Sequence, residues 1–569
     1  MVRFLVFFSV LSLIFSGCGS STTGPGDTGT TTDTGVDIST DTTPPDTATT
    51  DAQDDNGPAD ATDTADDAGS STDNGQVEDT GSAEDNGQAE DTGPSEDTAQ
   101  STDTGSPDSG SNNDATDTSQ AVDAGPPPVG SADWMTVFGG AGHEEIRGVT
   151  ADSQGNVYVT GLYREQFTVG TETFTATEPG TNTADAFVVS FNASGDFRWA
   201  HAFGAPGADT AFEVSVDGSD NVYVAGSHHS DLTIGTELLE SKGSTDIFVV
   251  SYDAEGNQLW AKNWGGPYGE SPRDLAVNPA GDIFITGSFT GSIVADDVTA
   301  TTGVVNGLSE VFVLAIDGVS HDALWVQAFR GHDHDVGTSL VADDTRSTVT
   351  AVSYYGILTV DEEQGIVFDG GADFNVGLIR LDQHGNVMWA QEFGGSGSEE
   401  ILGMGMDDWG TVYITGVFSE VANFGGPDLV GTSGHDVMLA AYNSGGVHLW
   451  SRAFTGEGTD QGLDLEVGDN GIYVAGRFRT NLQFGDIELH SSSDSYDIFV
   501  AGFSSADGTP FWAESVGSTD DDIGAGIGLG GDGGIYVGGY IKADATFADL
   551  LYPVTGSGLD AYIFRYEEE

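Results

Sequence analysis

The sequence is poor in several residues on which large classes of proteins depend. Its 569 residues include one Cys, and 15 Lys and Arg stand against 92 Asp and Glu, which gives a formal net charge of -77. A single Cys excludes an internal disulfide framework and a Cys-based zinc site. The shortage of cations excludes a nucleic-acid-binding protein that works through phosphate contacts. It also excludes docking on anionic lipids through a polybasic patch.

The motifs of common enzyme classes are missing too. There is no Gly-x-Ser-x-Gly, His-Glu-x-x-His or phosphate-binding loop, and we assign no catalytic residue. The densest polar cluster is Gly331–Asp335, which contains His332 and His334. Two His residues at positions i and i+2 point the same way only on a strand. This segment is predicted to be a loop, so a metal site there is the less favoured interpretation.

The N-terminal residues have the pattern of an export signal. A positive residue precedes an apolar run over residues 4–15, which is about 18 Å long as a helix and too short for a bilayer core of about 30 Å. The run ends in Phe15-Ser16-Gly17-Cys18, which resembles a bacterial lipobox. The resemblance implies that residues 1–17 are a lipoprotein signal peptide and that Cys18 carries a lipid in the outer membrane. The alternative is an ordinary signal peptide in which Cys18 is incidental.

Residues 18–130 are predicted to be a disordered linker anchored at Cys18. Residues 19–130 include 26 acidic residues, no Lys or Arg, and no Phe, Tyr, Trp, Leu or Met. Nothing there can form a core that offsets the entropy cost of folding. Because like charges repel, such a chain is expanded. We therefore expect a spacer that holds the following domain away from the membrane.

The remainder, residues 131–569, repeats seven times. A Trp recurs at spacings of 61 to 65 residues. We call these residues the Trp series: Trp134, Trp199, Trp260, Trp325, Trp389, Trp450 and Trp512. Each begins a segment such as WAHAFGAPG, and segments such as NVYVAG and DIFVVSY follow in a constant order. These segments are short and rich in Val, Ile, Phe, Tyr and Thr, which is typical of β-strands.

The repeat predicts an all-β fold, a seven-bladed β-propeller with four strands in each blade. In the first repeat the strands are expected at Glu145–Ala151, Val157–Tyr163, Asp185–Phe191 and Asp196–Phe203. The first predicted strand is a Trp strand, Asp133–Phe138, that has no repeat of its own. The last predicted strand, Asp560–Tyr566, corresponds to the third strand of a repeat. We expect the N-terminal strand to complete the last blade and close the ring, because closure removes exposed sheet edges.

The motifs FGG-x-G-x-[DE], G-x-V-Y-V-T-G, D-A-F-V-V and G-N-x-x-W keep this order, and the pattern resembles the bacterial SBBP-type β-propeller repeat over nearly all of residues 134–566. The resemblance implies a β-propeller and a secreted bacterial setting, but no single activity. Each member of the Trp series is expected to pack between blades, and Trp264 is expected in the core. Trp409, in the turn Asp407–Gly410, is the candidate for an exposed contact.

Two acidic positions also recur. The acids ten residues after each Trp form the first acid series: Glu144, Asp209, Glu270, Asp335, Glu399, Asp460 and Asp522. The residues that open each third strand form the second acid series: Asp185, Asp246, Glu310, Asn375, Asp436, Asp497 and Asp560. A feature kept in every blade is usually architectural, so we expect these carboxylates to accept backbone N–H bonds and join one blade to the next. The alternative is a cation site, with calcium as the candidate and no other cofactor predicted.

These patterns favour a non-enzymatic outer-membrane lipoprotein that displays a β-propeller at the cell surface for protein or glycan binding or adhesion. The connections between second and third strands, such as Thr168–Ala184 and Thr290–Ser309, are long and differ in sequence. Binding residues often lie in such loops on a rigid scaffold. One alternative is an oxidoreductase similar to the quinone-cofactor propellers, whose repeats also carry a G-x-x-x-W turn. Another is a periplasm-facing scaffold for envelope assembly.

Overall fold

The structure is a computed structural model and describes residues 131–567 except 303–307, 332, 433, 548–549 and 555–557. These residues belong to the second of the two units into which the chain divides, Val122–Glu569. The predictions for the signal peptide, Cys18 and the linker lie outside the described residues, as does His332. Every regular element in the described part is a β-strand, which confirms the all-β prediction. That part contains no helix with the length and apolar character needed to cross a membrane.

The strands fall into antiparallel sets of four, which we number as repeats 1 to 7 along the chain. The inner strands are β2 (Glu144–Ala151), β8 (Thr210–Val216), β14 (Glu270–Val277), β20 (Val336–Ala342), β24 (Glu399–Met406), β30 (Gln461–Val467) and β36 (Ile523–Leu529). The second strands are β3 (Val157–Tyr163), β9 (Val222–His228), β15 (Ile283–Phe289), β21 (Thr348–Asp361), β25 (Val412–Phe418), β31 (Ile472–Arg479) and β37 (Gly534–Ile541).

The third strands are β6 (Asp185–Phe191), β12 (Asp246–Tyr252), β18 (Glu310–Ile316), β22 (Ile366–Leu381), β28 (Asp436–Tyr442), β34 (Tyr496–Phe503) and β40 (Asp560–Glu567). The outer strands of repeats 1 to 6 are β7 (Phe197–Phe203), β13 (Gln258–Trp264), β19 (Ala323–Gly331), β23 (Val387–Gly395), β29 (His448–Glu457) and β35 (Pro510–Val516). In repeat 7 the strand beside β40 is β1 (Ser131–Gly140), from the start of the described chain.

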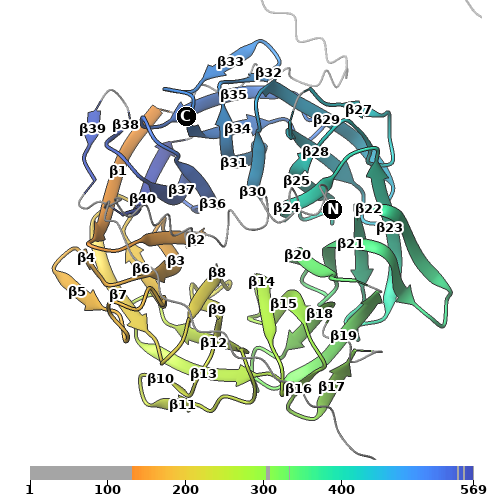
Figure 1. Ribbon diagram of the computed structural model, residues 1–569, viewed down its shortest axis with the longest axis horizontal. Helices are drawn as coiled ribbons and strands as arrows, with labels where there is room; N and C mark the ends of the chain where they lie inside the picture. The colour runs from red at the N-terminus through yellow and green to blue at the C-terminus, as the bar shows by residue number, and fades with distance from the viewer. Residues whose placement is uncertain are drawn as a thin grey trace, which may run out of the picture. The chain divides into compact units, whose positions relative to one another are not determined.

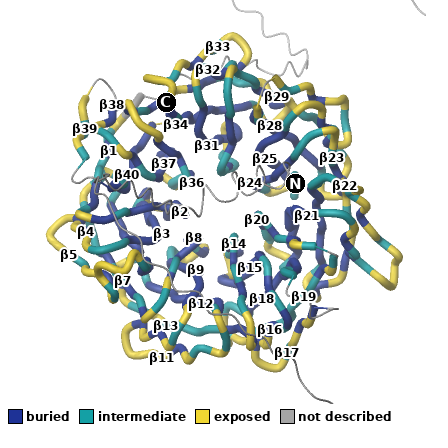
Figure 2. The backbone as a smooth tube through the Cα atoms, in the orientation of Figure 1, coloured by how far each residue is buried: buried dark blue, intermediate teal, exposed yellow. Residues whose placement is uncertain are grey.

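Burial explains why the second and third strands read as continuous apolar runs. All seven residues of β3 are buried, and the same holds for β6, β9 and β12. A strand covered on both faces has no solvent-facing positions for polar residues. Figure 2 shows this buried middle of each sheet and the exposed turns at the periphery.

Asp and Gly shape the turn that joins the inner strand to the second strand of repeat 1. Asp152 Oδ1 accepts hydrogen bonds from Gln154 N at 2.9 Å and Asn156 N at 2.8 Å. Gly155 has a φ of 77°, a conformation that favours glycine. Asp and Gly, which are typical turn residues, therefore form a tight turn here.

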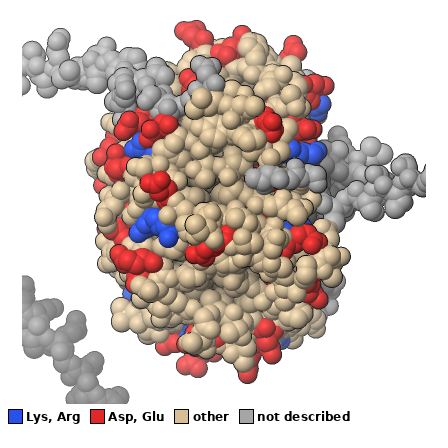
Figure 3. Space-filling view, turned by 90° about the vertical axis from the view of Figure 1, so that its left-hand side faces the viewer, with Lys and Arg blue, Asp and Glu red and all other residues tan. Residues whose placement is uncertain are grey.

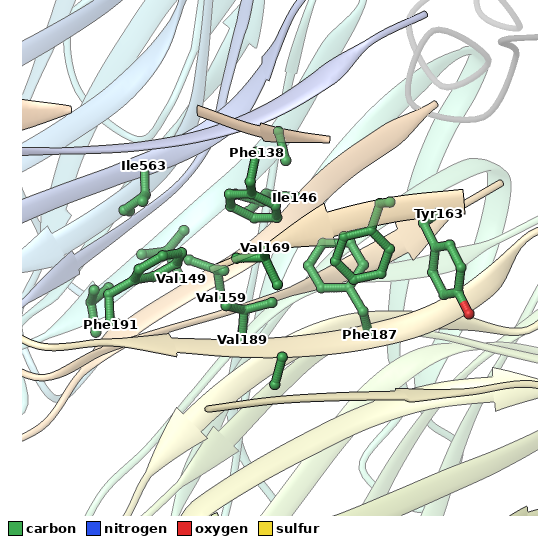
Figure 4. Packing of buried hydrophobic residues seen from close by; sticks show 14 of the residues in the cluster. Phe138, Ile146, Val149, Val159, Tyr163, Val169, Phe187, Val189, Phe191 and Ile563 are labelled. Carbon is green, nitrogen blue, oxygen red and sulfur yellow. The ribbon is translucent and has the colours of Figure 1, made fainter. Parts of the chain in front are cut away.

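The inner strands approach one another around a common centre (Figure 1). β2 contacts β8, and each following inner strand contacts the next as far as β36, which contacts β2. The hydrophobic residues form clusters between neighbouring repeats. One cluster joins repeats 7 and 1, where Phe138 and Ile563 pack with Ile146, Val159 and Phe187 (Figure 4).

The first strand of the described chain has partners on both sides. β1 pairs with β40 in an antiparallel register that places Met135 opposite Phe564. At its other end, Gly139 and Gly140 pair with Thr168 and Phe167 of β4 (Gln166–Val169). The N-terminal strand thus lies beside the C-terminal strand, as the sequence led us to expect.

Candidate functional site

The Trp series joins each outer strand to a turn in the next repeat. Trp199 lies against Gly256, where an added Cβ would be 2.7 Å from the indole, and its Nε1 donates to Ala254 O at 3.0 Å. The same pair of contacts recurs as Trp134–Gly195, Trp325–Gly385, Trp389–Gly446 and Trp450–Gly508. These glycines have positive φ values between 70° and 86°. The Gly and the Trp of the repeat motif therefore form the two sides of one contact: the Trp of each repeat packs on the Gly of the next.

Two members of the Trp series depart from this arrangement. Trp260 stacks on His321, with ring centroids 4.3 Å apart, and His321 takes the positive-φ position that Gly holds elsewhere. Trp512 packs edge-on against Tyr566, with ring centroids 4.9 Å apart. Trp264 is fully buried and Trp409 is 83% exposed, as expected for both.

Every side chain of the first acid series is buried, with no more than 1% exposed. Glu144 Oε2 accepts a hydrogen bond of 3.0 Å from Gly140 N, which ends the outer strand of the preceding repeat. Asp209, Glu270 and Asp522 accept the equivalent bond, also from the residue four places earlier. Asp209 also accepts a bond of 3.1 Å from His229 N, just after the second strand. Each such carboxylate thus fixes the loop between two repeats.

The second acid series holds a different loop. Asp185 Oδ2 accepts hydrogen bonds from the backbone N and Oγ1 of Thr177, at 2.7 and 2.8 Å. Thr432 and Ser492 donate in the same way to Asp436 and Asp497, whereas Asp246 accepts from the Ser241 hydroxyl and from Lys242 N. These Ser and Thr residues were not singled out from the sequence. A hydroxyl residue four to eight places before each of these acids is the signal that would have found them.

The two acid series meet in pairs at the junctions between repeats. A Cβ added to Gly265 would lie 2.0 Å from Asp246 Oδ1 and 2.7 Å from Glu270 Oε2. At Gly139 the corresponding atoms are Asp560 Oδ1 at 2.6 Å and Glu144 Oε2 at 2.8 Å. The glycine that follows Phe or Trp in the repeat motif therefore makes room for a carboxyl pair. In the fourth repeat the second member of the pair is an amide, because Asn375 faces Gly394 there.

Burial raises the pKa of every acid in the first series, and a neighbouring acid of the second series adds to the effect at most junctions. The pKa is raised to about 8 for Glu144, Glu270, Asp335, Glu399 and Asp460, and to about 7 for Asp209 and Asp522. Such carboxyls take up protons near neutral pH. No group of three or more His, Cys, Asp or Glu side chains with the geometry of a metal site occurs among the described residues.

The connections between second and third strands are more regular than the sequence indicated. Most form a hairpin: β4 with β5 (Glu172–Thr175), β10 (Leu232–Ile234) with β11 (Glu237–Leu239), β16 (Ser292–Ala295) with β17 (Val298–Thr301), β26 (Val421–Asn423) with β27 (Leu429–Val430), β32 (Asn481–Phe484) with β33 (Ile487–His490), and β38 (Ala545–Phe547) with β39 (Leu550–Tyr552). In repeat 4 the long strands β21 and β22 pair directly.

These hairpins carry core residues as well as exposed ones. Phe167 in β4 is fully buried and Val169 is 2% exposed. Leu232, Ile293 and Phe484 are buried at comparable places. Alternation of apolar and polar residues, as in Gln166–Val169, was the signal that marks a half-buried strand.

A set of residues missed by the sequence analysis lies at the centre. Each inner strand has a break in register after its third residue or nearby, typical of a β-bulge. We call the extra residues the bulge set: Arg147, Phe212, Arg273, Thr338, Leu402, Leu463 and Ala525. The backbone geometry of the bulge recurs in every inner strand, whereas the residue type at the bulge differs between repeats. Residues that differ between otherwise equal positions are better candidates for ligand contact than those kept in every repeat.

Charged side chains gather around the bulge set. The guanidinium of Arg147 lies 5.3 Å from the centroid of the Phe212 ring and 3.7 Å from Glu145 Oε2. Burial and the positive charge of Arg147 lower the pKa of Arg273 to about 10. Elsewhere Asp and Glu are spread over the visible surface with few Lys and Arg (Figure 3). Arg147 and Arg273, on inner strands of different repeats, are thus close enough for the charge of Arg147 to lower the pKa of Arg273.

No family model matches the chain. Among curated proteins, an uncharacterized WD repeat-containing protein of Acanthamoeba polyphaga mimivirus is 20% identical over 354 residues, which covers 51% of this chain and 25% of that protein. Regulatory protein FlaEY of Caulobacter vibrioides is 26% identical over 305 residues, covering 48% of this chain and 30% of that protein. The chain thus spans about a quarter to a third of the length of these relatives.

Solved structures give more distant similarities. A protein of unknown function from Dyadobacter fermentans is 10% identical, with a TM-score of 0.36, covering 78% of this chain and 100% of that one. Sqt1 from Chaetomium thermophilum is also 10% identical, with a TM-score of 0.34, covering 77% of this chain and 100% of that one.

Proposed function

We propose that residues 131–567 form a seven-bladed β-propeller that β1 closes. Three observations support this proposal. The inner strands contact one another in sequence until β36 meets β2, β1 pairs with β40, and one hydrophobic cluster combines residues of repeats 7 and 1. The similarity to a WD repeat-containing protein is in keeping with it. Each repeat is one blade in this account.

We infer that this propeller is a non-enzymatic binding module for a protein or glycan. The observation that carries the inference is the bulge set, whose backbone geometry repeats while its side chains change from Arg to Phe, Thr, Leu and Ala. A rigid scaffold with variable residues at one place is suited to recognition. The Trp and acid series are proposed to be architectural, because their contacts recur between repeats.

Binding is tested with the mature chain, residues 18–569, carrying Cys18→Ser so that it stays in solution. The chain is applied to a glycan array and to immobilised surface extracts of the same cells, with and without Leu402→Arg in the bulge set. We expect saturable binding that Leu402→Arg alters, and unchanged binding after Leu238→Arg in the exposed hairpin strand β11. If Leu238→Arg alters binding and Leu402→Arg does not, the binding site lies on the hairpins and not on the bulge set.

We propose that Cys18 carries a lipid that anchors the protein in the outer membrane, with residues 18–130 as the spacer. The single Cys at the end of an apolar run supports this proposal. Fractionation of cells that express Cys18→Ser tests the anchor, and we expect the variant to leave the membrane fraction. Retention at the wild-type level would contradict lipidation.

Display at the surface is tested separately by proteinase K treatment of intact cells. We expect the propeller to be released or degraded while a periplasmic marker stays intact. Protection from the protease would instead favour the scaffold that faces the periplasm.

A further inference from the structure

Gln461 and Arg477 form a side-chain pair in repeat 6 that differs from its equivalents in the other repeats. The two residues lie opposite each other on β30 and β31, and Arg477 Nε donates a hydrogen bond to Gln461 Oε1 at 2.6 Å. At the same register the other pairs are Glu145–Leu162, Thr210–Ser227, Ser271–Ser288, Val336–Ser353, Glu400–Val417 and Ile523–Tyr540. Repeat 6 alone thus places a cation where the other repeats have neutral or acidic side chains.

Arg477 is a buried arginine without a carboxylate at ion-pair distance. It is 3% exposed, and its one hydrogen-bond partner among the described residues is the neutral amide of Gln461. Arg380 and Arg565 are buried to a similar degree, and each has a carboxylate oxygen at 2.6 Å. Burial lowers the pKa of Arg477. Because a buried guanidinium is costly without an anion beside it, this place favours a ligand that supplies one.

The pair has three donor groups that are not used within the described part of the chain. An arginine only donates, so the bond from Arg477 makes Gln461 Oε1 the acceptor and leaves Gln461 Nε2 as a donor. The other two donors are Nη1 and Nη2 of Arg477. The fully enclosed, unpaired polar atoms of the described residues do not include these three nitrogens, so solvent reaches them. Two N–H groups of an arginine match the two oxygens of a carboxylate.

An aromatic ring and an acid complete the surroundings of Arg477. The ring centroid of Tyr496, which is partly exposed, lies 4.4 Å from the guanidinium carbon. Asp521 is exposed, accepts a hydrogen bond of 3.1 Å from Tyr496 N, and acts on Arg477 from beyond ion-pair distance. Asp521 repels a ligand that is only an anion. A sugar acid instead brings hydroxyl groups that donate to Asp521 and an apolar ring face that packs against tyrosine.

We propose that Arg477 and Gln461 bind the carboxylate of a uronic acid in a glycan, with the sugar ring against Tyr496 and its hydroxyl groups toward Asp521. The proposal rests on the binding function inferred above and names the ligand class. Gln461 comes two residues before Leu463 of the bulge set. The contact therefore lies on the same inner strand as one member of that set.

Calorimetric titration of the mature Cys18→Ser chain tests this with three probes. D-Glucuronate carries the carboxylate and the ring, D-glucuronamide has a neutral amide in place of the carboxylate, and acetate lacks the ring. We expect D-glucuronate to bind at least about tenfold more tightly than each of the other two, a difference of about 1.4 kcal/mol. Equal binding of D-glucuronamide overturns the role of the carboxylate, equal binding of acetate overturns the sugar class, and binding of none overturns the whole proposal.

Variants assign the contact to Arg477. Arg477→Met is expected to weaken D-glucuronate at least about tenfold. Arg479→Met is the matched control and should change nothing, because Arg479 lies two residues further along β31, is paired with Asp494 at 3.1 Å and has a side chain that is 42% exposed. Melting curves show whether each variant is folded, and Gln461→Leu, expected to weaken binding about threefold, replaces Arg477→Met if that variant does not fold. Equal weakening by Arg477→Met and Arg479→Met would indicate a general effect of charge and overturn the assignment.

The outcome separates this inference from the binding function. If the array or the cell extracts give a ligand that Leu402→Arg alters but D-glucuronate does not bind, the uronic-acid assignment fails and the binding function stands. If neither these assays nor the calorimeter detect binding by the folded chain, both fail.

Discussion

The indole of Trp199 covers the backbone of Gly256 in the next repeat, where φ is 86° and an added Cβ would lie 2.7 Å from the ring. The outer strand of one repeat is thus joined to a turn of its neighbour by a contact that needs both residues. The hydrogen bond from Trp199 Nε1 to Ala254 O completes it.

Gly256→Ala is expected to destabilise the folded chain by about 2 to 4 kcal/mol. Two costs combine, because an alanine is strained at positive φ and its methyl group meets the indole. Gly365→Ala is the matched control, since Gly365 has a φ of 70° and nothing within 4 Å of an added Cβ. Urea unfolding should show that the control loses about 1 to 2 kcal/mol. Equal losses would mean that the Trp contact contributes little.

The carboxyl pairs predict how stability depends on pH. Burial and its neighbour Asp246 raise the pKa of Glu270 from 4.5 to about 8. Between these values the folded state binds a proton that the unfolded state lacks, so the free energy of unfolding falls as pH rises from about 4.5 to about 8. The other acids of the first series shift in the same direction. We expect the melting temperature in EDTA to decrease from pH 5 to pH 9.

Asp246→Asn tests the pairing itself. The neutral amide is the isostere of a protonated carboxyl, and Asn375 already occupies this position in the fourth repeat. We expect the variant to lose less stability than wild type between pH 5 and pH 9, and Asp231→Asn, at an exposed position, to behave as wild type. If calcium chloride restores wild-type stability at pH 9 and the variant does not respond, the junctions bind a cation and the proton account is wrong.

Phe167→Ala should show that the hairpins belong to the core. Phe167 is fully buried, with the rings of Tyr163 and Phe187 at 4.7 and 5.4 Å, so we expect a loss of about 3 to 5 kcal/mol. The adjacent Thr168→Ala, on the exposed side of the same strand, should change stability by less than about 0.5 kcal/mol. Chemical denaturation measures both changes in the free energy of unfolding. If Phe167→Ala loses as little stability as Thr168→Ala, the hairpin does not belong to the core.

The sequence alone was sufficient to predict the strands, because residue periodicity and turn residues determine strands through local interactions. The expected Val157–Tyr163 and Asp185–Phe191 are the observed β3 and β6. The Trp series and the first acid series were also found, because a repeat makes a conserved position visible within one chain. Pairing of acids such as Asp246 and Glu270 was not foreseen, because it joins residues of successive repeats across a loop.

The bulge set was missed for the opposite reason. Arg147, Phe212 and Arg273 share no residue type, so a search for repeated residues passes over them. Their common feature is the register shift in the inner strands, which depends on backbone pairing. Differences between aligned repeats, read position by position, are the sequence signal that points to them.

The central claim is that β1 closes the ring, and deletion of residues 131–138 tests it most directly. This variant removes β1, one of the two strands that pair with β40, while deletion of residues 119–126 shortens the chain equally within the predicted linker. We predict that the first deletion lowers the melting temperature and exposes an edge that aggregates, that a peptide of residues 131–140 added in trans restores the wild-type melting temperature, and that the second deletion changes nothing. An unchanged melting temperature after the first deletion would contradict the closed ring.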